Sequence, residues 1–82
     1  MPYFTYILKS QKNKDIYMGS CENVLIRLCR HNTGRVKSTK GYAPWSLLEY
    51  KEFDTRSEAV KCERLLKTHQ QKDIIKKKYN KA

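Results

Sequence analysis

The stretch IYMGSCENVLIRLCRHN, residues Ile16 to Asn32, decides the fold because its first half has the pattern of a strand and its second half that of a helix. Its opening run, IYMG, is apolar and aromatic and ends at a glycine, which is typical of a short strand. Further on, Val24 and Leu28 are one helical turn apart. We expect a helix that begins at residue 22 or 23, where asparagine is a favoured N-cap, and ends between residues 32 and 34.

Two further strands flank this unit. Residues Tyr3 to Lys9 (YFTYILK) are rich in aromatic and β-branched side chains, and the polar SQKNKD that follows is typical of a turn. This run and Ile16 to Gly19 are therefore expected to form a β-hairpin. Residues Trp45 to Phe53 (WSLLEYKEF) form a third strand. Strict alternation would divide its side chains into two faces: Trp45, Leu47, Glu49, Lys51 and Phe53 on one, and Ser46, Leu48, Tyr50 and Glu52 on the other.

A second helix follows the third strand. The TRSE sequence has the form of a capping box, with Thr55 at the N-cap and Glu58 three residues later. Apolar side chains then recur at helical spacing: Ala59, Cys62 and Leu66, with Leu65 alongside. Residues 68–82 are rich in lysine and form a short final helix or a solvated extension. We therefore predict one α+β domain, residues 1–82, with a small three-stranded antiparallel sheet flanked by helices in the order β-β-α-β-α plus the basic C-terminal segment.

The charge of the chain indicates its class of partner. Lysine and arginine outnumber aspartate and glutamate by 18 to 8, which gives the 82 residues a formal charge of +10. A small domain this basic repels itself, and nucleic acid is the usual polyanion that compensates; a general solubility effect is the alternative. No apolar run reaches the ~20 residues that span a bilayer, and the sequence does not open on a leader-like segment. We expect a cytoplasmic protein with no membrane partner.

The three cysteines, Cys21, Cys29 and Cys62, include no Cys-x-x-Cys pair. The sequence therefore predicts no disulfide framework and fits a reducing compartment. A zinc site that combined cysteines with His31 and His69 would have a spacing that matches no common ligand pattern. We interpret all three cysteines as small buried apolar side chains.

Four residues of the hairpin and the first helix can carry chemistry. If the turn is centred between residues 11 and 12, Tyr6 lies directly opposite Tyr17, whereas a slip by one residue would separate them. Arg27 and His31 are four residues apart on one helix face, where a guanidinium can hold a phosphate in a fork of hydrogen bonds. The plainer interpretation is strand-forming tyrosines and a solvated arginine with a packed stem.

Glu63 borders the apolar stripe of the second helix. A carboxylate there can bind Mg²⁺, because this ion usually takes one or two carboxylates and keeps several waters. The plainer interpretation is an exposed ion pair with Lys67, four residues later.

In combination these residues resemble the GIY-YIG nuclease superfamily, particularly its small stand-alone bacterial proteins. The resemblance rests on short motifs whose order and spacing run through nearly the whole chain. They are TYI at residues 5–7, YMG at residues 17–19, RLCRHN with Arg27 and His31, STKG at residues 38–41, and RSEAVKCERLLK with Glu63.

The resemblance implies metal-dependent cleavage of a nucleic-acid phosphodiester, with Mg²⁺ or Mn²⁺ as cofactor. Tyr6 would be the general base or its close support, and Tyr17 would orient or deprotonate the attacking water. Arg27 would neutralise the pentacoordinate phosphate, His31 would tune a tyrosine or contact the phosphate, and Glu63 would bind the metal. Together these groups would supply the base, the charge neutralisation and the leaving-group stabilisation that the reaction needs.

The leading hypothesis is a DNA endonuclease, structure-selective or weakly specific, with a role in DNA repair; DNA is favoured over RNA as the partner. Arg30 on the first helix and Arg35, Lys37 and Lys40 in the loop after it are expected to contact phosphates, which position a nucleic acid without reading its sequence. Two other classes fit the charge: a non-catalytic nucleic-acid-binding module on the same scaffold, and a structural protein of an RNA assembly.

Overall fold

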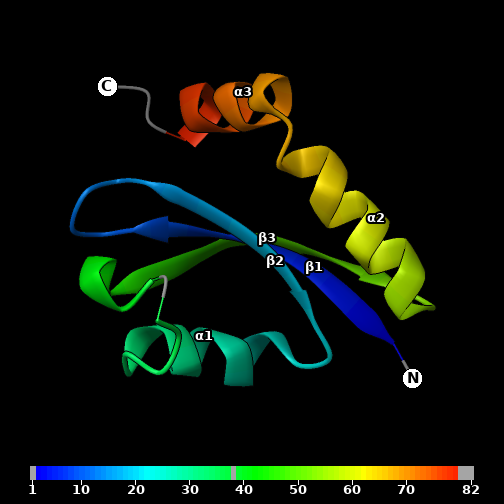
Figure 1. Cartoon of the computed structure of the whole chain (residues 1–82), viewed down its shortest axis with the longest axis horizontal. Coiled ribbons are helices and arrows are strands. Elements are labelled where there is room, and N and C mark those ends of the chain that lie inside the picture. The colour runs from blue at the N-terminus through cyan, green and yellow to red at the C-terminus, as the bar shows by residue number, and fades with distance from the viewer. Residues whose placement is uncertain (1, 38, 80–82) are drawn as a thin grey trace.

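The structure, a computed structural model, describes residues 2–37 and 39–79. In chain order the elements are β1 (Tyr3–Ser10), β2 (Ile16–Cys21), α1 (Val24–Asn32), a short 3-10 turn (Lys40–Tyr42), β3 (Trp45–Phe53), α2 (Arg56–Leu66) and α3 (His69–Tyr79). Figure 1 shows the sheet in the middle, α1 on one side of it and α2 and α3 on the other. The predicted α+β class and element order are confirmed. The basic C-terminal segment is a helix as far as Tyr79, and residues 80–82 lie outside the described part of the chain.

The strands form an antiparallel sheet in the order β2-β1-β3, so β1 is central and β2 lies at an edge. In the hairpin Leu8 pairs with Tyr17, and Tyr6 pairs with Gly19. The predicted pairing of Tyr6 with Tyr17 is therefore wrong, because the loop closes one residue later, with Lys14 at a φ of 61°. This changes the register by two residues, so both tyrosines still face the same side of the sheet.

β3 contains a bulge that the sequence pattern did not predict. Ile7 lies opposite Glu49, whereas Leu8 lies opposite Leu47, so Leu48 is an extra residue in the pairing. An extra residue sends the side chains beyond it to the other face. The predicted division of β3 is therefore wrong: Trp45, Leu47, Tyr50 and Glu52 lie on the face of Tyr6, and Ser46, Glu49, Lys51 and Phe53 lie on the opposite face.

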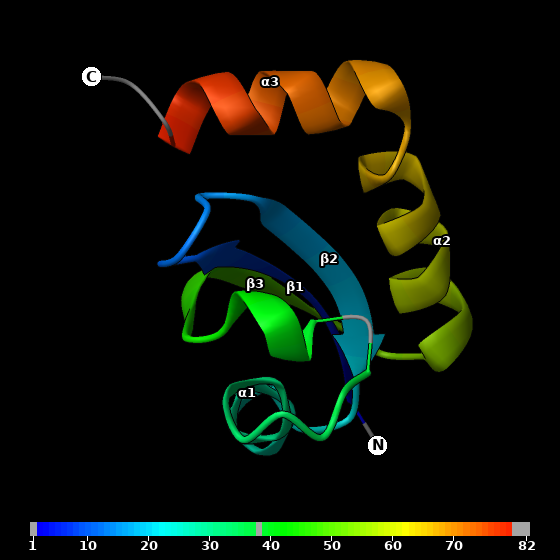
Figure 2. The same ribbon diagram turned by 60° about the vertical axis from the view of Figure 1, so that its left-hand side comes forward.

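Helices cover both faces of the sheet, and Figure 2 shows α3 across the top, α2 down the side and α1 beneath. On one face Tyr6 packs with Val24 of α1 and with Trp45. On the other face Ile7 packs in a cluster that contains Ile75 of α3. Because both faces are covered, four consecutive side chains of β1 are at most 2% exposed.

Local capping signals set the ends of α1. The side chain of Asn23 accepts a hydrogen bond from a backbone N–H of the first turn at 3.0 Å, as predicted. At the other end Gly34 has a φ of 77°, its N–H donates to the carbonyl of His31, and the N–H of Arg35 donates to the carbonyl of Arg30. This pair of bonds is a Schellman cap, which turns the chain back toward the helix.

The predicted N-cap of α2 also forms, because Thr55 accepts a hydrogen bond from the backbone N–H of Glu58 at 3.2 Å, and its hydroxyl donates to the Glu58 carboxylate at 3.0 Å. The helix is tied to the sheet by Thr5, whose hydroxyl donates to the carbonyl of Ala59 at 2.7 Å. Two apolar predictions are wrong: Leu65 points to solvent and is 61% exposed, and Cys29 is exposed rather than buried. Within residues 2–37 and 39–79, no helix has the length and apolar character needed to cross a membrane.

Candidate active site

A buried chain of polar groups links β1, α1 and the loop before β3. The hydroxyl of Tyr6 lies 3.2 Å from Nε2 of His31, and Nδ1 of His31 lies 2.7 Å from Oγ1 of Thr39. All three residues are at most 2% exposed. Thr39 donates its hydroxyl proton to the carbonyl of Val36 at 3.3 Å, so its oxygen accepts from Nδ1 of His31. Nε2 is then the atom that accepts from Tyr6.

The two titratable members of this chain stay neutral at pH 7. Burial, followed by the charge of Arg27, lowers the pKa of His31, so the imidazole remains unprotonated at Nε2. Burial raises the pKa of Tyr6 to about 12, although the neighbouring Arg27 acts in the opposite direction. Tyr6 therefore keeps its proton and donates it in the hydrogen bond to His31.

The hydroxyl of Tyr6 lies directly against Gly19 of β2. A Cβ atom at position 19 would be 2.5 Å from the Tyr6 oxygen and 2.8 Å from Cζ. The ring cannot easily move aside, because Tyr6 is 1% exposed. Glycine is required here by the close approach of a side chain.

Tyr17 forms the exposed side of the same aromatic cluster. Its ring centroid is 4.9 Å from that of His31, 6.1 Å from that of Trp45 and 6.4 Å from that of Tyr6. Nζ of Lys67 lies 5.9 Å from the centroid of the Tyr17 ring. Tyr17 is thus the partly exposed tyrosine of the pair, and a cation lies beside it.

Arg27 lies between Tyr6 and an open groove of about 290 Å³ that it lines together with Ser20 and Arg30. The adjacent Tyr6 hydroxyl raises the pKa of Arg27, which keeps the guanidinium charged. Nε of Arg27 is buried and has no hydrogen-bond partner among the described residues. A buried N–H that lacks a partner is costly, and an anionic oxygen is the acceptor that would satisfy it best.

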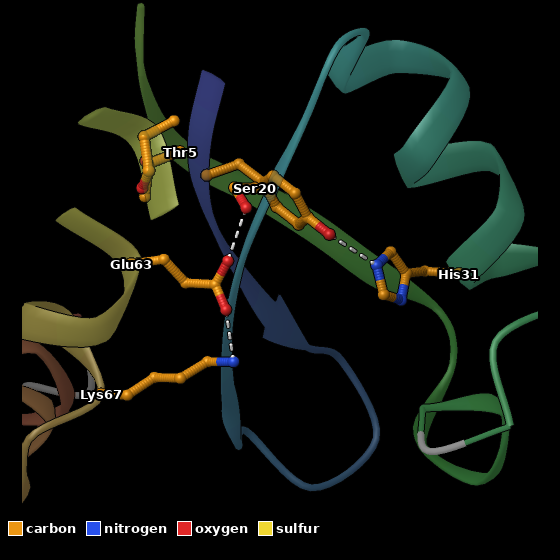
Figure 3. Close-up of polar contacts among 7 residues, drawn as sticks. Thr5, Ser20, His31, Glu63 and Lys67 are labelled. Carbon is orange, nitrogen blue, oxygen red and sulfur yellow. Dashed lines mark hydrogen bonds and ion pairs between the residues drawn. The ribbon is translucent and has the colours of Figure 1, made fainter. Parts of the chain in front are cut away.

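Glu63 reaches β2 from α2, on the opposite face of the sheet. Ser20 donates its hydroxyl proton to Oε1 of Glu63 at 2.7 Å, and Nζ of Lys67 donates to Oε2 at 2.7 Å. Figure 3 shows both contacts, with His31 approaching from the other side. Burial raises the pKa of Glu63, but the hydrogen bonds from Lys67 and Ser20 outweigh it and the net pKa is lowered. The carboxylate is therefore ionised at neutral pH.

The candidate residues thus belong to two groups that meet at β2. Four of them lie together on the face covered by α1: Tyr6, Tyr17, Arg27 and His31. Glu63 comes from the opposite face. The two groups meet because neighbouring side chains of a strand point in opposite directions, Tyr17 toward α1 and Ser20 toward α2.

The donor chemistry at Glu63 fits a hard divalent cation. The described residues contain no cluster of three or more His, Cys, Asp or Glu side chains that could enclose a metal. Mg²⁺ does not need such a cage, because it is bound by one or two carboxylates and keeps its waters. An ionised Glu63 with the hydroxyl of Ser20 beside it provides that kind of site.

The basic residues expected to contact nucleic acid lie on the α1 side and are exposed: Arg30, Arg35, Lys37 and Lys40. Arg30 lines the same groove as Arg27. Among residues 2–37 and 39–79, none of these four forms an ion pair, whereas three α3 lysines pair with carboxylates: Lys76 with Asp15, Lys77 with Asp73 and Lys78 with Glu49. The uncompensated positive charge therefore includes the surface next to the groove.

Sequence reasoning missed three contributors to the site. Thr39 orients His31 from a loop eight residues away, and no local pattern marks such a contact. Ser20 and Lys67 hold the two oxygens of Glu63. The spacing of Lys67 from Glu63 did predict an ion pair, but not that the same ammonium would also lie beside Tyr17.

Comparison with known proteins identifies the family. A family model described as the GIY-YIG catalytic domain matches residues 2–80. The chain belongs to the GIY-YIG family. This membership places it in a nuclease superfamily and agrees with the resemblance seen in the sequence.

Relatives of this GIY-YIG protein are small bacterial proteins named UPF0213. One from Listeria monocytogenes, lmo0166, is 41% identical over 66 residues, which are 79% of this chain and 72% of the relative. One from Staphylococcus saprophyticus, SSP2268, is 35% identical over 75 residues, 90% of each chain. The solution NMR structure of the UPF0213 protein BH0048 from Bacillus halodurans is similar, with a TM-score of 0.55 and 27% identity, covering 92% of this chain and 82% of that one.

Proposed function

We propose that this GIY-YIG protein is an endonuclease that hydrolyses DNA phosphodiester bonds with the help of Mg²⁺ or Mn²⁺. One observation carries the proposal: a charged guanidinium, whose buried Nε–H has no partner among the described residues, and an ionised glutamate approach the same edge strand from opposite faces. Arg27 is suited to a phosphate oxygen, and Glu63 to a divalent cation. A phosphodiester that is being cleaved needs both.

The two tyrosines differ in a way that suggests their roles. Tyr6 is buried, its pKa is raised to about 12, and its proton is engaged with His31. Tyr17 is partly exposed and has Lys67 beside its ring. We assign the orientation or deprotonation of the attacking water to Tyr17 and a supporting role to Tyr6. His31 is 0% exposed, which favours tuning of Tyr6 over contact with the phosphate.

In the proposed reaction, water attacks phosphorus, one P–O bond forms and another breaks, and the products are a phosphate monoester and a free hydroxyl. Arg27 balances the negative charge that develops on the phosphoryl oxygens. Glu63 would hold the metal ion, which would supply positive charge to stabilise the leaving oxygen. Arg30, Arg35, Lys37 and Lys40 hold the backbone of the substrate near the groove, so selectivity comes from DNA shape rather than from base contacts. A role in DNA repair fits such a shape-selective nuclease.

The test is cleavage of labelled duplex, branched and single-stranded DNA, and of RNA, with and without Mg²⁺ or Mn²⁺. The decisive variants are Glu63→Gln, which keeps the size of the side chain, and Arg27→Gln. We expect each to reduce the cleavage rate by about 100-fold or more. Glu52→Gln and Arg56→Gln are matched controls, because both residues are exposed and lie outside the site.

Two results would contradict the proposal in different ways. Cleavage that persists in Glu63→Gln and Arg27→Gln would come from a contaminant or from another site. Salt-sensitive binding with no metal-dependent cleavage by the wild-type protein would favour the non-catalytic nucleic-acid-binding module, since phosphate contacts alone produce a strong salt dependence.

A further inference from the structure

Lys67 connects the two groups of candidate residues. Its Nζ donates to Oε2 of Glu63 at 2.7 Å and lies 5.9 Å from the centroid of the Tyr17 ring. Figure 3 shows Lys67 extending from the end of α2 toward β2, where its Nζ meets the Glu63 carboxylate. A single ammonium therefore contacts the proposed metal ligand and lies beside the tyrosine assigned to the attacking water.

Both oxygens of the Glu63 carboxylate already have a hydrogen-bond donor. Ser20 holds Oε1 with a neutral hydroxyl, and Lys67 holds Oε2 with a positive charge. A hydroxyl oxygen can remain next to a metal ion, since it also has lone pairs. An ammonium has no lone pair and repels a divalent cation on the same carboxylate.

The geometry also indicates that the Lys67 ammonium is the group that would move away from Glu63 when a metal ion binds. The pair between Lys67 and Glu63 spans one helical turn, and the Lys67 side chain is 48% exposed, whereas that of Glu63 is 19% exposed. An ion pair this exposed contributes little, and a long solvated side chain can change its rotamer at small cost. Lys67 can therefore yield its position, while Glu63 stays anchored by Ser20.

We propose that Lys67 is a positioning residue that occupies the Glu63 carboxylate in the metal-free protein and turns fully toward Tyr17 when a divalent cation binds. This inference rests on the proposed function. In the second position the ammonium favours the phenolate form of Tyr17 before the attack, and this phenolate becomes neutral when it takes the proton of the attacking water. Metal binding thereby couples two events: the divalent cation binds the Glu63 carboxylate, and the displaced Lys67 ammonium moves to Tyr17. The plainer alternative is a structural ion pair that only helps α2 to form.

The experiment measures Mn²⁺ affinity directly, from the electron paramagnetic resonance signal of free Mn²⁺, in the full chain without DNA. Lys67→Gln is compared with Lys61→Gln, which removes the same charge from an exposed position of the same helix. We expect Lys67→Gln to bind Mn²⁺ about three- to tenfold more tightly than Lys61→Gln, because only Lys67 competes for the carboxylate. Glu63→Gln is expected to abolish the binding.

A second measurement separates competition from the effect on the tyrosine. At saturating Mn²⁺ and DNA, we expect kcat of Lys67→Gln to fall about tenfold while the Mn²⁺ concentration for half-maximal activity also falls. Lys61→Gln should change neither value. A purely structural ion pair would not produce tighter metal binding together with slower turnover.

The outcomes distinguish this inference from the proposed function. Equal Mn²⁺ affinity in Lys67→Gln and Lys61→Gln, with normal binding by the wild type, overturns the role of Lys67 alone. Mn²⁺ binding that is unchanged in Glu63→Gln overturns the metal ligand itself, and both proposals fail. Tighter binding by Lys67→Gln supports the competition even if no DNA substrate is cleaved.

Discussion

The hydroxyl of Tyr6 lies 3.2 Å from Nε2 of His31, and both residues are at most 1% exposed. One hydrogen bond inside the core thus joins the sheet to α1, between two residues that are 25 positions apart in the chain. The bond fixes the tautomer of His31, because Nδ1 faces Thr39. The candidate site is therefore built on a neutral pair whose geometry can be tested apart from any activity.

Replacing Tyr6 with phenylalanine removes this bond and leaves Nε2 of His31 buried without a donor. We expect Tyr6→Phe to lower the free energy of unfolding by about 1–2 kcal/mol. Urea unfolding followed by the fluorescence of Trp45, which is the one tryptophan, would measure the change. The exposed Tyr42 provides the control, since Tyr42→Phe should alter the value by less than about 0.5 kcal/mol. Equal effects of the two substitutions would contradict the buried bond.

The lowered pKa of His31 predicts a stability that falls on mild acidification. The unfolded chain takes up a proton at His31 near its ordinary pKa of 6.5, and the folded chain takes it up only at lower pH. The contribution of His31 is therefore complete above about pH 6.5 and is lost as the pH falls toward the lower folded pKa. We expect the urea midpoint to decrease between pH 7.5 and pH 5.

Variants at the two histidines identify the source of that slope. His31→Gln should flatten the dependence on pH between 7.5 and 5, whereas His69→Gln should retain it, because His69 is exposed at the start of α3. A slope that survives His31→Gln would assign the effect to another group. Glu63 titrates below this window, because its pKa lies under its ordinary value of 4.5.

Alanine at position 19 would place a Cβ 2.5 Å from the Tyr6 oxygen. We expect Gly19→Ala to destabilise the fold by about 1–3 kcal/mol through overpacking. In Tyr6→Phe the oxygen is absent but Cζ remains 2.8 Å from the new Cβ, so the double variant should recover only part of the loss. If the losses of stability from Gly19→Ala and Tyr6→Phe were strictly additive, the new Cβ at position 19 would not be clashing with the Tyr6 side chain.

Arg27 is the position where stability and function are expected to conflict. Its buried Nε has no partner in the described part of the protein, so Arg27→Met removes an unsatisfied donor and keeps the apolar stem. We expect the free energy of unfolding to rise by about 1 kcal/mol while DNA cleavage falls by about 100-fold or more. Chemical denaturation and a cleavage assay on one preparation would check both. A large loss of stability would mean that Arg27 serves the fold.

The four exposed basic residues beside the groove should each contribute one phosphate contact. Replacing Arg30, Arg35, Lys37 or Lys40 with glutamine is expected to reduce the slope of log K against log salt by about 0.9 for duplex DNA. Fluorescence anisotropy at several salt concentrations would measure it. Lys77 is the matched control, since it is paired with Asp73 on α3, and its substitution should leave the slope unchanged.

Local signals in the sequence predicted much of the fold. The caps at Asn23 and Thr55 involve hydrogen bonds to residues three positions away, so the printed sequence contains both partners. The bounds of β3 follow from its aromatic and apolar composition and from the proline before it. The bulge at Leu48 does not, because it depends on which residue of β1 lies opposite, and alternation alone cannot specify that.

The sequence proposed a set of candidate site residues but not their arrangement. The family motifs named Tyr6, Tyr17 and Glu63 as candidates, which remains a prediction, and the approach of Glu63 from the opposite face depends on how α2 crosses the sheet. The register of the hairpin was set by the conformation of its loop, where Lys14 has a positive φ. A lysine in the sequence does not predict a positive φ. The position of Glu63 is thus a long-range outcome of packing, whereas the hairpin register follows from a local loop conformation.

The edge position of β2 sets the temperature range in which such a site could work. β2 pairs with β1 alone within the described sheet, yet it carries Tyr17 for one face and Ser20 for the other. Edge strands fray in sub-global opening events that cost less than complete unfolding. Fraying of this one strand would separate Tyr17 from the contact between Ser20 and Glu63. It would also open the core beside α3, because Ile16 and Met18 of β2 are buried in that cluster. Amide hydrogen exchange of β2 would then report the loss of a competent site together with the opening of that core.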